Sequence, residues 1–408
     1  MPLDRQELRD LVENVMAALE RYSSSFASTP GGAGWLHVQH VPVRRFVAEI
    51  LRKLLVLSAW EPFAAAPGPV TLAPYEGLVG LRSSSSREYL AYTVTWSGIA
   101  YLLGAVAPYN PSRSAQLRNL SRASTANTEP SPLPSRLRER DVVALSWSSR
   151  HAATLMPVFV ELESAGQTSL MLDLATDPAE RCPTPAFTGI DLCTSPSDLF
   201  TLSGTAEGLH LPEDRHTVRI KDHAVQLACL LRLLSVLLES IGGCTQPSWR
   251  ALVQAETWLD GVLAATRPHT VLLSNDTSPL GALAVHTAER HGANTVHVQH
   301  GAWTAESVAW PTLHSRDVVV MGERDRPLAT AWARHPAAEV HVLGQPRFDV
   351  LAGLGREAQR RYLEKLLAPG NRRAPVRIAV WACQPFGPDR LKAQADLLLD
   401  GLRAADSD

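Results

Sequence analysis

Several familiar signatures are missing from this chain of 408 residues. The five cysteines include no Cys-x-x-Cys pair, which argues against a disulfide framework or a thiolate zinc site and is typical of a reducing cytoplasm. No Gly-x-Gly-x-x-Gly motif and no Walker A lysine occur, so a standard dinucleotide or ATP loop is excluded. The first 22 residues are charged and amphipathic and lack the apolar core of a signal peptide, so secretion is not expected.

An excess of one charge is also missing. The chain has 39 basic and 41 acidic residues, which gives a formal net charge of -2. No overall field draws it to a polyanion, so we expect no nucleic-acid partner. With 45% hydrophobic residues the chain has enough apolar surface for a large core, and its length favours two or three domains.

One uncharged segment raises the question of a membrane. Residues 89–109 carry no charge and begin and end with tyrosine, as a membrane-spanning helix would. Polar residues and Pro108 dilute the segment, and its β-branched and aromatic residues suit buried strands. We therefore favour buried core or a partner interface and a cytoplasmic location. Peripheral contact with the inner face of the membrane is the alternative.

Composition divides the chain into five parts. Residues 1–110 are expected to be a mainly helical N-terminal region, and residues 111–140, dense in serine, proline and arginine, a solvated linker. Short apolar strands alternate with helices over residues 141–351, which predicts an α/β fold with a doubly wound, parallel, Rossmann-like sheet. Residues 352–375 follow as a connecting helix and linker. Residues 376–408 offer one strand and one helix, the start of an incomplete second Rossmann-like domain.

The expected elements place the candidate site. Strands are predicted at residues 141–146, 168–173, 270–275, 295–299, 317–321 and 339–343, with a further one near residue 190, and helices at 155–165, 221–241, 248–265, 280–291 and 326–334. In such sheets ligands bind beyond the carboxyl ends of the strands, where the strand order reverses. The residues that follow each strand are therefore the candidates.

Two histidines are the candidate catalytic residues. His151 follows the first strand and His300 follows the strand at residues 295–299. An imidazole at this edge has a pKa near neutrality and suits a general base acting on an acceptor hydroxyl. The alternative for His151 is a polar neighbour of a helix N-cap, and for His300 a structural histidine.

Polar residues after the other strands are the candidate substrate-binding residues. Asn275, Asp276 and Thr277 precede a helix, where they cap its N-terminus or contact a phosphate. Gln299 and Gly301 flank His300, and the glycine allows a ligand to approach the backbone.

Two further candidates lie in the loops beyond. Trp303 stacks on a sugar or base, or packs its loop. Arg347 binds a phosphate or carboxylate, or closes an interdomain turn. No metal site is expected: His-Val-Gln-His occurs at residues 37–40 and 297–300, and two histidines without a third ligand are weak support for one.

Four motifs together resemble a known family. They are the strand that ends in Gln-His-Gly at residues 299–301, the Gly-Gln-Pro-Arg-Phe-Asp turn at 344–349, the preceding strand-turn-helix at 270–291, and a strand with a Gln-Pro loop at 384–385. Residues 268–388 are similar to GT-B fold glycosyltransferases of bacterial surface and capsule carbohydrate synthesis, including CDP-glycerol glycerophosphotransferase-like proteins.

The resemblance implies an activity. It suggests transfer of a sugar or polyol phosphate from a nucleotide-sugar or CDP-polyol donor to a carbohydrate or lipid-linked acceptor, with no cofactor besides the donor. His151 looks like the acceptor-side base of that family, and Gln384 enters as a substrate-binding residue. The full-length protein would be the enzyme, and this chain need not be active alone.

Two rival interpretations remain. Residues 275–301 also resemble non-hydrolysing UDP-N-acetylglucosamine 2-epimerases, but Gln299 stands where that family has a carboxylate, and an amide does no acid/base chemistry. The other rival is a non-catalytic scaffold that keeps the acceptor-side domain to hold a partner.

Overall fold

A computed structural model provides the fold. It describes residues 5–23, 26–58, 70–72, 82–83, 86–87, 90–95, 100–108, 133–134, 137–182, 191–196, 199–200, 210, 212–213, 215–220, 223–228, 230–231, 234, 238, 248–303, 312–353, 355–357, 359–361 and 388–405. The chain divides into two compact units, Met1–Asp349 and Val350–Asp408. This division lies within two residues of the boundary expected at residue 351.

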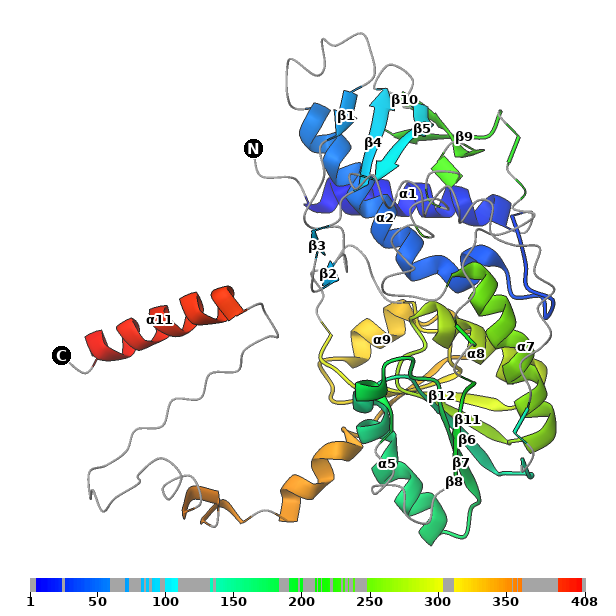
Figure 1. Ribbon diagram of the computed structural model, residues 1–408, viewed down its shortest axis with the longest axis vertical. Helices are drawn as coiled ribbons and strands as arrows, with labels where there is room; N and C mark the ends of the chain where they lie inside the picture. The colour runs from blue at the N-terminus through cyan, green and yellow to red at the C-terminus, as the bar shows by residue number, and fades with distance from the viewer. Residues whose placement is uncertain are drawn as a thin grey trace. The chain divides into compact units, whose positions relative to one another are not determined.

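The first unit contains a seven-stranded sheet (Figure 1). Its strands are β6 (Val142–Ser146), β7 (Ser169–Asp173), β8 (Asp191–Thr194), β11 (Thr270–Leu273), β12 (Asn294–Val298), β13 (Asp317–Val320) and β14 (Glu339–Val342). Every neighbouring pair is parallel, in the order β14-β13-β12-β11-β6-β7-β8. The predicted α/β class with a parallel, Rossmann-like sheet is confirmed.

The strands form because their side chains are apolar on both faces. On β6, Val143 and Leu145 face one hydrophobic cluster, while Val142 and Ala144 face another. Parallel sheets are covered by helices on both sides, so such strands have no polar face. Helices α5 (Ser149–Ser164), α7 (Trp249–Thr266), α8 (Pro279–Arg290) and α9 (Arg326–Trp332) supply the cover.

Serine caps fix where three of these helices begin. Ser148, Ser248 and Ser278 precede α5, α7 and α8, and each hydroxyl accepts a backbone N–H from the first helical turn. Leu155 and Phe159 of α5 pack on one face of the sheet, and α7 and α8 pack on the other. The starts of α5 and α8 are thereby held at the carboxyl ends of β6 and β11.

The strand order reverses between two central strands. β6 pairs with β7, the next strand of the sheet in the chain, and also with β11, from which the order runs outward to β14. Loops that leave β6 and β11 therefore diverge to opposite sides. In open α/β sheets this is the point at which ligands bind.

The N-terminal region does not stand apart from the sheet. Helices α1 (Arg5–Tyr22) and α2 (Trp35–Ser58) share one hydrophobic core with β6, α7 and α8. The region's two helices are its longest elements, and five short strands follow them: β1 (Val70–Leu72), β2 (Arg82–Ser83), β3 (Ser86–Arg87), β4 (Leu90–Thr95) and β5 (Ala100–Pro108). The linker expected at residues 111–140 lies largely outside the described residues, and the division into compact units does not fall there.

The uncharged segment at residues 89–109 forms strands. β4 and β5 pair antiparallel within it, as its β-branched and aromatic residues favour. Of the helices in the described part of the chain, none combines the length and apolarity needed to cross a bilayer.

Three further expectations concern single elements of the chain. The helix expected from residue 221 is preceded by a hairpin of β9 (Thr217–Ile220) and β10 (His223–Gln226), so helical residues begin only at 227. The turn at 344–349 continues into the 3-10 helix η4 (Pro346–Gly353). The C-terminal helix is confirmed as α11 (Pro388–Ala405), whereas the strand expected at 376–382 lies outside the described residues.

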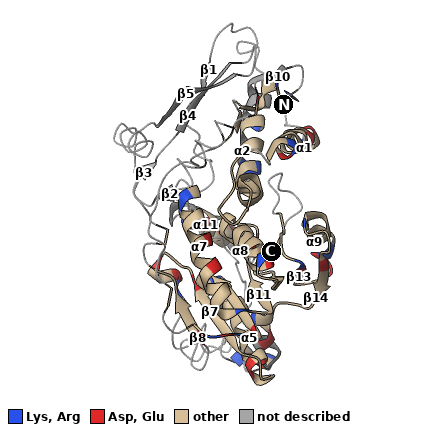
Figure 2. Cartoon of the chain, turned by 90° about the vertical axis from the view of Figure 1, so that its right-hand side faces the viewer, with Lys and Arg blue, Asp and Glu red and all other residues tan. Residues whose placement is uncertain are grey.

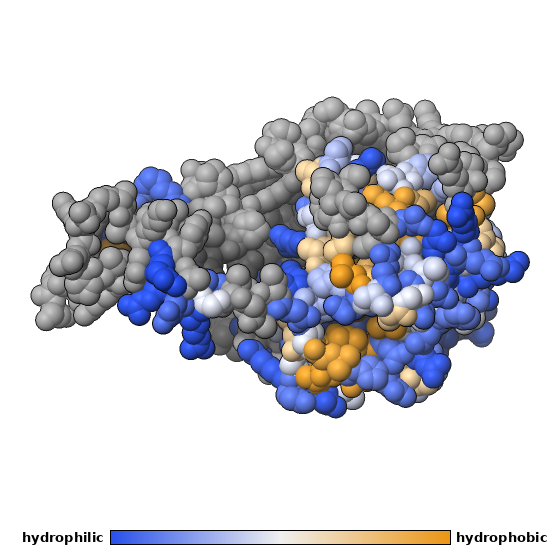
Figure 3. Space-filling model, turned by 90° about the horizontal axis from the view of Figure 1, so that it is seen from below, coloured by the Kyte–Doolittle hydropathy of each residue, from blue (hydrophilic) through white to orange (hydrophobic). Residues whose placement is uncertain are grey.

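The surface carries both charge signs. Figure 2 marks both basic and acidic residues along the helices that cover the sheet. Seen from below, in Figure 3, apolar side chains lie among hydrophilic ones on the sheet-bearing body. Val160 of α5 is one of the exposed large apolar side chains. The described surface therefore has no single dominant charge.

Candidate functional site

The carboxyl end of β6 leads directly into α5. Ser148 caps the helix, and His151 follows in its first turn. Glu180, in the 3-10 turn η2 (Pro178–Glu180), lies at the start of the helix, where its Oε2 accepts hydrogen bonds from Ser148 Oγ (2.9 Å), Ser149 N (3.0 Å) and Ser149 Oγ (2.9 Å). These bonds lower the pKa of Glu180. The start of α5 thus already holds one negative charge from the chain itself.

The neighbouring strands supply the second histidine. His300 follows β12, and its Nδ1 lies 2.5 Å from the backbone oxygen of Ser274, which follows β11. A carbonyl oxygen only accepts, so Nδ1 carries the hydrogen, and in the neutral ring Nε2 keeps its lone pair. The backbone of one strand end therefore orients His300 with a nitrogen free to accept a proton.

The two predicted histidines meet at the reversal of strand order. The ring centroids of His151 and His300 are 4.9 Å apart with an interplanar angle of 74°. The Trp147 ring also packs on His151 in an edge-to-face arrangement, with centroids 4.8 Å apart. His151 is buried and His300 is partly exposed, so His300 presents the accessible nitrogen of the pair.

Both imidazoles are neutral at pH 7. Burial and, to a smaller extent, the neighbouring His300 lower the pKa of His151 to about 3. Burial also lowers the pKa of His300, although its bond to Ser274 O opposes this. Positive charge on Arg347 and Arg150 acts in the same direction as burial. Both rings are therefore hydrogen-bonding groups, and His300 is able to act as a base.

Unsatisfied polar atoms gather around His300. His151 Nδ1, Ser274 Oγ, Gln345 Oε1 and Arg347 Nε are buried and have no hydrogen-bond partner in the described part of the chain. Most buried polar atoms in folded proteins are paired, so several unpaired ones in one place need a reason. Donors and acceptors are both represented, which suits a polar ligand.

Two arginines make this edge positive. Arg150 belongs to the first turn of α5, and Arg347 to the turn after β14. The Arg347 guanidinium also lies 4.8 Å from the ring centroid of Phe348, which restricts its orientation. Gln345, from the same turn, donates from Nε2 to the backbone oxygen of Gln299 (2.6 Å) and so ties this turn to the end of β12.

Asp276 lies behind the histidines and holds another segment in place. Its carboxylate is fully buried, with Oδ1 2.8 Å from His297 Nδ1. Oδ2 accepts backbone N–H bonds from His314 (2.9 Å) and Ser315 (2.8 Å). Burial acts to raise the pKa of Asp276, but His297 and the backbone donors outweigh it and lower the pKa. In the structure the carboxylate of Asp276, a predicted substrate contact, is bonded to other residues of the chain.

Other predicted substrate contacts are also occupied within the chain. Gln299 is buried; its Nε2 donates to Gly301 O (2.9 Å), and its Oε1 accepts from Met321 N (2.8 Å). Asn275 Oδ1 accepts from Thr277 Oγ1 (2.8 Å) and from Ser278 N (3.2 Å), which shapes the turn before α8. The backbone of Gly301 is free of close neighbours, because a Cβ added there would meet nothing within 4 Å.

Three predicted residues remain, Trp303, Arg347 and Gln384. Trp303 packs on Trp332, with centroids 5.1 Å apart, and on His297, so it stabilises its loop. The positive charge of Arg347 lowers the pKa of His300, so Arg347 acts on this histidine electrostatically. Gln384 lies outside the described residues. The structure thus brings together His151, His300 and Arg347.

Four residues of the site were not predicted. Trp147 and Arg150 adjoin His151 in the chain, and their position after a strand could have signalled them. Ser274 contributes through its backbone oxygen, which no side-chain pattern reveals. Glu180 follows Ser148 by 32 residues and reaches α5 only through the fold.

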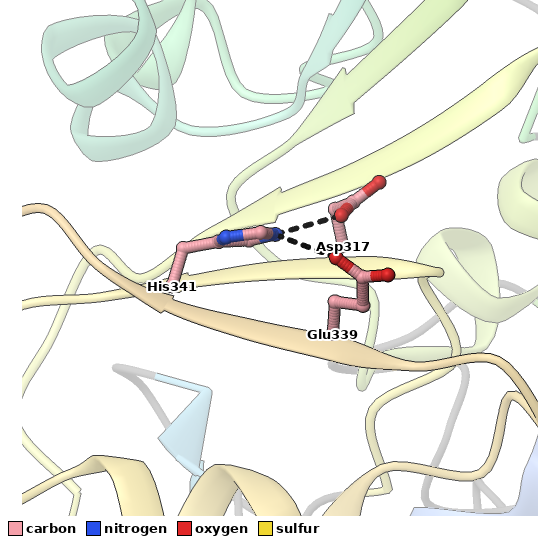
Figure 4. Close-up of side chains that lie close together, drawn as sticks. All are labelled: Asp317, Glu339 and His341. Carbon is pink, nitrogen blue, oxygen red and sulfur yellow. Dashed lines mark hydrogen bonds and ion pairs between the residues drawn. The ribbon is translucent and has the colours of Figure 1, made fainter.

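One group of described side chains has the composition of a metal site. Asp317, Glu339 and His341 each place one ligand atom within 4.8 Å of the others (Figure 4). Asp317 and Glu339 are the first residues of β13 and β14, and His341 follows two residues after Glu339 on β14. Burial raises the pKa of the Cys182 thiol to about 12, so this cysteine is no nucleophile at neutral pH.

Comparison with models of known protein families, with curated proteins and with solved structures gives no match. The class of the chain therefore follows from its own architecture, an α/β protein with a parallel, Rossmann-like sheet and a histidine pair at the reversal of strand order.

Proposed function

We propose that the chain is a glycosyltransferase-like protein that binds a nucleotide-activated donor, either a nucleotide sugar or a CDP-polyol. It transfers the sugar or polyol phosphate to a carbohydrate or lipid-linked acceptor in surface polysaccharide synthesis. The proposed location is the cytoplasm. The supporting observation is the contact between His151 and His300 at the reversal of strand order, ringed by unsatisfied buried polar atoms.

Charge supports a phosphate-bearing ligand. Arg347 has a buried Nε without an acceptor, and Arg150 adds a second guanidinium near His300. Guanidinium groups bind phosphate oxygens through charge-assisted hydrogen bonds. Because the imidazoles are neutral, they add hydrogen-bonding capacity, and the arginines supply the positive charge.

His300 is the proposed base for the acceptor. Its Nδ1–H is held by Ser274 O, which leaves Nε2 to take the hydroxyl proton as the acceptor oxygen attacks the donor. His151 is the proposed positioning residue, because its buried ring packs against His300 and limits the rotation of that ring. Trp147 also packs on His151.

The test uses a panel of nucleotide sugars and CDP-glycerol. Binding is measured by calorimetry, and nucleotide release in the presence of acceptor by phosphorus NMR. We expect His300→Ala to slow release about 10²–10⁴-fold, the usual contribution of a general base. His291→Ala is the matched control, because His291 also bonds an acceptor, Asp260 Oδ1 at 2.9 Å, but lies at the far end of α8.

Two results would refute the proposal. One is binding of no phosphate-bearing donor by the wild-type chain. The other is release by His300→Ala at the rate of the His291→Ala control.

A further inference from the structure

We propose that Asp317, Glu339 and His341 form a binding site for a divalent transition-metal ion at the amino ends of β13 and β14 (Figure 4). The proposal concerns the opposite end of the sheet from the histidine pair and does not depend on the proposed transferase activity.

The strand register brings the three side chains to one face. Asp317 pairs with Glu339, and Val319 pairs with His341. Residues two apart on a strand share a face, so Glu339 and His341 lie on the side of Asp317. His341 Nε2 is 2.8 Å from Asp317 Oδ1 and 4.0 Å from Glu339 Oε2.

These separations suit a single ion. With metal–ligand bonds of about 2.0–2.2 Å, the donor atoms of a tetrahedral site lie roughly 3.3–3.5 Å apart. To reach these separations, the distance between Asp317 Oδ1 and His341 Nε2 must lengthen and that between Glu339 Oε2 and His341 Nε2 must shorten. Rotation of the side chains is enough for both changes. The ion would then replace the direct contact between His341 Nε2 and Asp317 Oδ1.

Asn294 supplies a second observation. Its Nδ2 donates to Asp317 Oδ2 (2.8 Å), which orients the carboxylate as residues behind metal ligands do. Its Oδ1 is buried and has no hydrogen-bond partner. The amide of Asn294 thus fixes one oxygen of Asp317 and leaves Oδ1 of Asp317 to the proposed ion.

The donor set selects the class of ion. An imidazole with two carboxylates favours transition metals such as Zn²⁺ or Co²⁺ over Mg²⁺ and Ca²⁺, which prefer oxygen ligands alone. The His341 side chain is 38% exposed and that of Asp317 20%, so an ion reaches the site from solvent. β14 is the last strand on its side of the described sheet, and an ion between β13 and β14 would fasten this edge.

The experiment titrates the metal-free chain with Zn²⁺ by calorimetry and with Co²⁺ by visible absorption. We expect one Zn²⁺ site in the wild type that is absent from His341→Ala and from Glu339→Gln. We expect Asn294→Ala to weaken it about 10–100-fold, the usual effect of removing a residue behind a ligand. Zn²⁺ should raise the thermal midpoint of the wild type and not of His341→Ala.

His291→Ala is the matched control. His291 lies 2.9 Å from Asp260, nearly the distance found in the proposed site, but it has no third ligand group. The control should keep the full Zn²⁺ stoichiometry. Equal stoichiometry and affinity in the wild type and in both ligand variants would overturn the proposal. Circular dichroism shows whether each variant is folded. If His341→Ala does not fold, Zn²⁺ binding by Glu339→Gln, a change at an exposed residue, decides the test.

Discussion

The two ends of the parallel sheet use histidine in opposite surroundings. At the carboxyl ends of β11 and β12, His300 lies near Arg347 and Arg150, and burial and positive charge lower its pKa. At the amino ends of β13 and β14, His341 contacts Asp317 at 2.8 Å and Glu339 at 4.0 Å. One end therefore suits an anion and the other a cation.

The difference follows from the direction of the strands. Helix N-termini and diverging loops gather at the carboxyl ends, where they favour negatively charged ligands. At the amino ends of β13 and β14 the first residues of the strands are the acidic residues Asp317 and Glu339. Histidine thus occurs in both proposed sites, one for an anion and one for a cation.

The largest expected effect comes from the carboxylate behind the histidine pair. Asp276→Ala removes the acceptor of two buried backbone N–H groups and the partner of His297. We expect a loss of about 3–5 kcal/mol in the free energy of unfolding, measured by urea denaturation. Asp260→Ala, which breaks a half-exposed pair with His291, should cost about 0–1 kcal/mol. Equal losses would contradict the structural position of Asp276.

Two glycines near the site should respond differently. A Cβ at Gly281 would overlap the backbone oxygen of Asn275, so Gly281→Ala must push α8 away from the end of β11. We expect it to cost about 1–3 kcal/mol of unfolding free energy, as overpacking does. Gly301→Ala meets nothing within 4 Å and should leave stability unchanged. A stable Gly281→Ala variant would show that α8 does not approach the loop this closely.

Acid should destabilise the protein through its buried histidines. Burial lowers the pKa of His151 and of His314 to about 3, below the unfolded value near 6.5. Between these values the unfolded chain binds protons that the folded chain does not, so stability falls as pH drops from about 6.5 toward 3. The slope is up to about 1.4 kcal/mol per pH unit for each group.

Urea midpoints at pH 7.5 and 5.0 measure this slope. His151→Gln and His314→Gln should flatten it, because each removes one group that titrates only in the unfolded state. His291→Gln, which replaces a partly exposed histidine, serves as the control. Unchanged slopes in the first two variants would show that their rings are protonated in the folded protein.

The smallest expected effect concerns Glu180. Glu180→Gln removes the negative charge at the start of α5 and keeps a hydrogen-bond acceptor for Ser148 and Ser149. We expect the affinity for inorganic pyrophosphate, measured by calorimetry, to rise about 2–5-fold, as one like charge near the surface is removed. Glu161→Gln, at the other end of α5, should have no effect. A weaker affinity in Glu180→Gln would count against an anion site at this edge.

The repeated tetrapeptide His-Val-Gln-His shows what local sequence settles. Residues 37–40 lie inside α2, whereas residues 297–300 end β12 and the loop after it. His40 bonds Thr312 at 2.7 Å and Glu20 at 3.1 Å, and His300 bonds Ser274. Identical residues thus take different structures because their tertiary neighbours differ.

The sheet and part of its site were predictable for a physical reason. Short apolar runs separated by helical patterns specify parallel strands, and strand ends specify the ligand edge, so His151 and His300 could be named in advance. The roles of Gln299 and Asp276 could not, because a polar residue after a strand serves the backbone or a ligand according to contacts made elsewhere. Glu180 was missed because only the fold brings it to α5.

The most direct test labels the histidine nitrogens and titrates the protein with inorganic pyrophosphate, and separately with Zn²⁺, under NMR. Histidine variants assign the signals. The account predicts that pyrophosphate shifts the signals of His300 and His151 and leaves those of His341 and His291 in place, while Zn²⁺ shifts His341. Pyrophosphate that leaves His300 unmoved, or moves His341 instead, would contradict an anion site at the carboxyl end of the sheet.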